Sequence, residues 1–169
     1  MLFCASSLHA VASAEGIDRN REYNLKAAFL YGFGRYITWR EESANSGDFR
    51  IGVLGESPIV EKLRKVAAKR ELHGRPLTIR VAQSVDQLGE CQIIFVASEV
   101  PDEEISRLFD TALPSTIVVG ERAELHDRGA SATFFLKGAA VRFELHHQIL
   151  QEKNVIVDAK LLSLSRTRL

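Results

Sequence analysis

Apolar residues recur at helical spacing near the start of the chain. From Glu22 to Trp39 they repeat every three to four residues and cover more than half the girth of the helix that this spacing predicts. A helix with so wide an apolar arc is either buried on two sides or leaves part of the arc for a partner protein. Aromatic anchors carry much of the binding energy of protein interfaces, so the aromatic residues of this arc are our candidate partner contacts, with burial in the core as the alternative. They are Phe29, Phe33, Tyr36 and Trp39.

Beyond a polar stretch, short apolar runs alternate with helical patterns. The expected strands are Phe49 to Leu54, Leu77 to Val81, Gln92 to Ala97 and Ser115 to Val119. Helical stripes separate them, such as Ile59, Leu63 and Val66 after the first strand. Continuous apolar runs are typical of parallel strands that are covered on both faces. The repeated strand–helix–strand order therefore predicts an α/β fold with a mainly parallel sheet, flanked by helices in Rossmann-like layers.

The pattern changes in the last quarter of the chain. The strand-like segments Ala132 to Leu136 and Ala140 to Leu145 are separated by a short link, which predicts a hairpin at the edge of the sheet. Helical segments are expected at His146 to Glu152 and Ala159 to Ser165, with a short strand at Val155 to Val157 between them. A charge and apolar residues at a sheet edge can meet a partner strand or helix, so Glu144 and Leu150 are further candidate contacts. The alternative is that Glu144 and Leu150 pack within the domain at the edge of the sheet and contact no partner.

The first fourteen residues contain no Asp, Glu, Lys or Arg, and this bias stops at Glu15. The small residues Ala12-Ser13-Ala14 are typical of a signal-peptidase site, so residues 1–14 are expected to be an export signal, truncated because its basic leading segment is missing. The alternative is a short, buried N-terminal helix. No later stretch has the roughly eighteen apolar residues that cross a bilayer, so we expect one domain over residues 15–169 that is not embedded in a membrane.

Composition narrows the classes of function. Lys plus Arg and Asp plus Glu both number 22, so no net charge attracts nucleic acid, which is not an expected partner. After the predicted signal the remaining cysteine is Cys91, which excludes an internal disulfide and is expected to pack as a small hydrophobic residue. No serine elbow or phosphate-binding glycine fingerprint is present, and no cofactor is expected. A binding module is therefore favoured over an enzyme.

Two groups of residues are weaker candidates for chemistry. The carboxyl ends of parallel strands usually form the ligand crevice of such a fold, and the turns there contain Gly55, Ser57, Ser98 and Gly120. The alternative is that the glycines serve only to form the turns and bind no ligand. The histidines lack the spacing of metal ligands and are expected to be solvated. They are His73, His126, His146 and His147.

Several sequence blocks resemble those of the YfiR-like family of periplasmic proteins. The blocks are Tyr23 to Phe33, Tyr36 to Trp39, Phe49 to Gly55 with Ser57-Pro58, His73 to Pro76, Cys91 to Phe95, Val141 to Glu144 and Leu161 to Arg166. The resemblance implies a soluble periplasmic inhibitor that binds the periplasmic domain of a membrane diguanylate cyclase and lowers cyclic-di-GMP. It also implies an OmpA-like outer-membrane lipoprotein that sequesters the inhibitor. Family members often carry disulfide cysteines and a Trp-Pro pair, whereas this chain keeps Cys91 and has Trp39-Arg40.

The leading hypothesis is therefore a periplasmic regulator that acts by binding a partner protein. The same apolar surfaces are also candidates for a homodimer contact. The alternative is a periplasmic sensor module that binds a small ligand in the crevice at the strand ends.

Overall fold

The computed structural model describes the backbone of residues 9–40 and 46–168, and the side chains of residues 19–40 and 46–166. The helices are α1 (His9–Tyr36), α2 (Ile59–Ala67), the 3-10 turn η2 (Val85–Gln87), α3 (Asp102–Thr111), α4 (Glu124–Asp127), α5 (His147–Glu152) and α6 (Ala159–Leu164). The predicted export signal lies outside the described residues, except for the backbone from His9 onward, which begins α1.

The strands follow the predicted order closely. They are β1 (Ile37–Trp39), β2 (Phe49–Leu54), β3 (Glu71–Leu72), β4 (Arg75–Ala82), β5 (Ile93–Val96), β6 (Ile117–Gly120), β7 (Ala132–Lys137), β8 (Ala140–His146), β9 (Val155–Val157) and β10 (Arg166–Arg168). The described residues form an eight-stranded sheet of order β10-β8-β7-β6-β5-β2-β4-β3 and a separate β1-β9 pair.

The main sheet is mixed. The five central strands, in the order β4-β2-β5-β6-β7, run parallel to one another. At the two ends of this block, β8 pairs antiparallel with β7, and β3 pairs antiparallel with β4. The α/β fold is therefore confirmed, with a sheet that is not purely parallel. The β7–β8 hairpin lies one strand inside the position predicted for it, because β10 pairs parallel with β8 and forms the edge.

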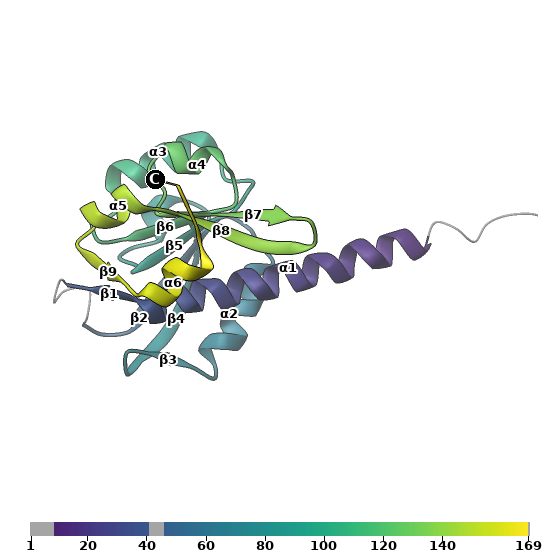
Figure 1. Ribbon diagram of the computed structural model, residues 1–169, viewed down its shortest axis with the longest axis horizontal. Helices are drawn as coiled ribbons and strands as arrows, with labels where there is room; N and C mark the ends of the chain where they lie inside the picture. The colour runs from purple at the N-terminus through teal and green to yellow at the C-terminus, as the bar shows by residue number, and fades with distance from the viewer. Residues whose placement is uncertain (1–8, 41–45, 169) are drawn as a thin grey trace, which may run out of the picture.

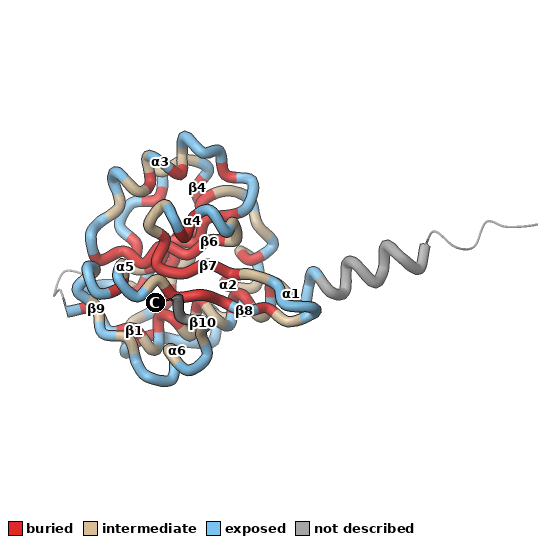
Figure 2. The backbone as a smooth tube through the Cα atoms, turned by 45° about the horizontal axis from the view of Figure 1, so that its top comes forward, coloured by how far each residue is buried: buried red, intermediate tan, exposed pale blue. Residues whose placement is uncertain are grey.

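Helices cover both faces of this sheet. Helices α1, α2 and α6 lie on one face, and α3 and α4 lie on the other (Figure 1). The buried residues gather in the central strands between these layers, as the red segments of Figure 2 show. Cys91 is buried beside β5, as expected for a small hydrophobic residue, and this burial raises the pKa of its thiol to about 11.

The first helix ends earlier than its apolar pattern predicts. It stops at Tyr36, and Ile37–Trp39 form strand β1, which pairs antiparallel with β9. The backbone N–H of Asp158 donates to the carbonyl oxygen of Tyr36 at 2.8 Å, and the indole N–H of Trp39 donates to the carbonyl oxygen of Ser115 at 2.8 Å. These contacts come from segments distant in sequence, so a local pattern does not reveal them.

Candidate protein-binding groove

The aromatic residues of α1 and β1 lie mostly in the core. Phe33 is fully buried and Trp39 is 3% exposed, so neither is available to a partner in the folded protein, which corrects the prediction for both. The ring of Phe33 packs edge-on against Phe143, with centroids 5.0 Å apart. Phe29 and Tyr36 are half-buried and remain accessible in part. The wide apolar arc thus mainly serves burial against the sheet, which was the alternative interpretation.

The second group of predicted contacts is also enclosed. Glu144 is 8% exposed and Leu150 is 3% exposed. Glu144 lies on β8 opposite Arg166 of β10, so the strand on which it lies is not the edge of the sheet. The prediction of an accessible edge at Glu144 and Leu150 is therefore wrong: β10 pairs with β8 beside Glu144, and Leu150 is buried on α5, which packs against β8 and β9.

The predicted crevice at the strand ends is filled by side chains. A Cβ placed on Gly55 would lie 2.6 Å from Cγ2 of Val100, and one on Gly120 would lie 2.1 Å from Cδ1 of Leu125. The hydroxyl of Ser57 accepts a hydrogen bond from the backbone N–H of Ile59 at 3.3 Å, at the start of α2.

Ser98 is exposed on the turn that follows β5. Gly55 and Gly120 are therefore close-packed turn positions and Ser57 lies in the turn before α2, so these residues do not form the open crevice predicted for a small ligand.

Two of the four histidines are not solvated as predicted. His126 of α4 is 7% exposed, and its ring stacks on that of His146 at 4.2 Å between centroids, since α4 packs beside the β7–β8 hairpin. His73 and His147 are exposed. Among the described residues, no three His, Cys, Asp or Glu side chains gather in a way that could hold a metal ion.

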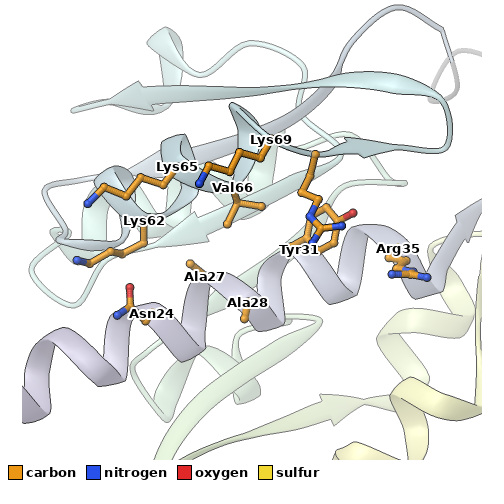
Figure 3. A pocket seen from close by; sticks show the side chains of 10 residues that line it. Asn24, Ala27, Ala28, Tyr31, Arg35, Lys62, Lys65, Val66 and Lys69 are labelled. Carbon is orange, nitrogen blue, oxygen red and sulfur yellow. The ribbon is translucent and has the colours of Figure 1, made fainter.

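An open groove runs between α1 and α2, on the face of the molecule away from the histidine pair. It encloses a cavity of about 410 Å³. Its apolar lining consists of Ala27, Ala28, Tyr31 and Val66. Its polar lining consists of Asn24, Arg35, Lys62, Lys65, Lys69 and Arg70. Figure 3 shows the lysines on the α2 side of the groove and the small apolar residues of α1 facing them.

The spacing of these residues explains how they meet. Lys62 and Lys65 lie three residues apart on one face of α2, and Lys69, in the turn after this helix, also lines the groove. The apolar stripe of this helix was recognisable in the sequence, whereas the basic row beside it was not recognised as part of a site. The signal was present in the sequence, but its meaning depends on α1 lying alongside.

The positive charges of the groove are only partly neutralised. Lys65 pairs with Glu61 at 2.7 Å, with both side chains about two-thirds exposed, and Lys62 donates to the amide oxygen of Asn20 at 2.5 Å. Within the part of the chain that the structure describes, neither Lys69 nor Arg70 has a carboxylate within 4 Å. The groove is therefore a region of positive charge in a chain with no net charge.

On the opposite face of the sheet, arginines form ion pairs with carboxylates of the same chain. Arg107 of α3 pairs with Asp86 at 2.7 Å and with Glu104 at 2.8 Å. Arg122 pairs with Asp102 at 2.7 Å. Here the cations are satisfied within the molecule, which distinguishes this face from the groove.

The inner side of α1 also contains a charged residue, Lys26. It is 4% exposed, donates to a carboxylate oxygen of Glu121 at 2.9 Å and also pairs with Glu22. Burial lowers the pKa of Lys26, but the hydrogen bonds that Lys26 donates to the two carboxylates, and their negative charge, outweigh this effect, so its pKa is raised. This buried ion cluster ties α1 to the turn after β6.

The fold and the groove together define an α/β domain with a concave, positively charged surface suited to a macromolecular partner. The chain matches the family described as YfiR/HmsC-like over residues 23–166, and it belongs to that family. The family is periplasmic, and its known context is regulatory. No curated protein matches the chain. None of the described helices is both long and apolar enough to span a bilayer.

Proposed function

We propose that this protein is a periplasmic regulator that binds the periplasmic domain of a membrane diguanylate cyclase and inhibits the enzyme. Cellular cyclic-di-GMP falls as a result. Residues 1–14 direct export, residues 15–169 form the regulatory domain, and an OmpA-like outer-membrane lipoprotein sequesters the regulator and so relieves inhibition. Binding alone produces the effect, without a reaction catalysed by this chain.

The observation that carries this proposal is the family match, which spans residues 23–166 and so includes the groove and the whole sheet except part of β10. The groove adds support of a different kind. It is an accessible surface with positive charges that the described residues only partly neutralise, and such charge favours association with a complementary protein.

The test is a gene deletion in the host, with cyclic-di-GMP measured in the deletion strain and in one that is restored with a secreted copy. We expect the level to rise on deletion and to return on restoration. A copy without residues 1–14 should not restore it, because it would not reach the periplasm. An unchanged level in conditions where the protein is expressed would refute inhibition of a cyclase.

A further inference from the structure

We propose that the groove between α1 and α2 receives an acidic amphipathic helix of the partner protein. This inference rests on the proposed function, since it names the surface and the partner chemistry through which that function acts. Phe33 is buried against the sheet, whereas Asn24, Ala28 and Arg35 on the groove side of α1 are exposed and accessible to a partner.

The shape of the groove favours a helix. On α1 its lining extends from Asn24 to Arg35, and eleven residues of helix (35 − 24) are about 16 Å long, or about three turns. The side chains of Ala27 and Ala28 in the groove are short, so another helix can approach the backbone of α1 closely. A trough of this length between two helices is suited to a third helix laid along it.

The charges select the kind of helix. Lys62, Lys65 and Lys69 follow one edge of the trough, and they flank an apolar floor that contains Tyr31 and Val66. A complementary helix places apolar residues against the floor and acidic residues against the lysine row. A protein helix fits the groove better than a membrane surface does, because the cations line a groove that also has an apolar floor.

The first experiment measures binding of the purified chain to the periplasmic domain of the host's membrane diguanylate cyclase. The test variant is Lys65→Glu/Lys69→Glu, and the matched control is Lys137→Glu/Lys160→Glu, which makes the same change in net charge at exposed sites outside the groove. We expect Kd to rise about tenfold or more in the test variant and less than about threefold in the control. Circular dichroism and the melting temperature establish that both variants fold.

Equal binding by all three proteins would overturn the groove proposal and leave the proposed function standing. If even the unaltered chain fails to bind the cyclase domain, the proposed function fails instead, and a second experiment then decides on the groove.

In that experiment p-benzoylphenylalanine replaces Ala28 in the groove or, as a control, Ala139 in the hairpin link, and the protein is crosslinked in its host. A crosslink from position 28 alone to an acidic amphipathic helix of another protein supports the proposal. No crosslink, or one to a second copy of this chain, overturns it.

Discussion

The two sides of α1 use different residues for different purposes. The side that faces the sheet contains large aromatic and aliphatic residues, with Leu30 and Phe33 fully buried and Lys26 held in an ion cluster. The side that faces the groove contains small residues such as Ala28, and cations lie across from it. The largest buried side chains of this helix therefore mark its core side, and the groove side is recognised by small residues and by cations that are only partly neutralised. Substitutions on the two sides should separate stability from binding.

The largest effect is expected from Phe33→Ala. Removing a fully buried phenylalanine ring from its contacts with Phe134 and Phe143 should lower the free energy of unfolding by about 3–5 kcal/mol. Urea denaturation followed by circular dichroism measures this. Tyr31→Ala, on the groove side of the same helix, is the matched control and should cost less than half as much, because its ring is half-buried. Equal losses would show that the two sides are not different in packing.

The next effect concerns the ion cluster on the inner side. Lys26→Met should lower the free energy of unfolding by about 3 kcal/mol, because it leaves Glu121 buried without its cation. Lys62→Met, at the groove, is the control and should change it by less than about 0.5 kcal/mol. Chemical denaturation at neutral pH compares the two. A loss below about 1 kcal/mol for Lys26→Met would mean that the cluster adds little to the fold.

The pH dependence of stability gives this cluster a second readout. The pKa of Tyr23 is raised by burial and by Glu121, and that of Lys26 is raised by its carboxylate partners. A raised pKa means that the folded state binds the proton more tightly, so the contribution is complete below the ordinary values of 10.0 and 10.5 and is lost as pH rises through the folded values. Stability should therefore fall more steeply above pH 10 in the unaltered protein than in Tyr23→Phe, which removes the contribution of the tyrosine and keeps Lys26 with its carboxylate partners.

Much of the fold was predictable because its strands are short, strongly apolar and bounded by turns. The run at Ile93–Val96 is buried along its whole length, and β2 has the predicted bounds Phe49–Leu54. The end of α1 was not predictable, because Ile37–Trp39 leaves the helix to pair with Val155–Val157 far along the chain. The edge at β10 likewise depends on a pairing between distant segments.

The candidate site was less predictable than the fold. An apolar arc on a helix shows that some of its residues are buried, but not which part of the arc lies against the sheet. Lys26 illustrates the limit, since its charge suggests exposure and its partner Glu121 is 95 residues away in sequence. The groove exists only where α1 lies beside α2, so its basic row appears as an ordinary solvated helix face when the sequence of α2 is considered alone.

The smallest effects come from two glycines of α1 that lie on different sides of the helix. A Cβ on Gly34 would lie 2.5 Å from Cδ1 of Leu72 and 3.2 Å from the ring of Phe49, so Gly34→Ala should destabilise the fold by about 1–2 kcal/mol. A Cβ on Gly32 would meet no atom within 4 Å, so Gly32→Ala should instead stabilise the helix by about 0.5–1 kcal/mol. The sign of the change in melting temperature distinguishes them. Stabilisation by both substitutions would mean that Leu72 and Phe49 yield readily, and that close approach of α1 to the sheet is not what requires glycine at position 34.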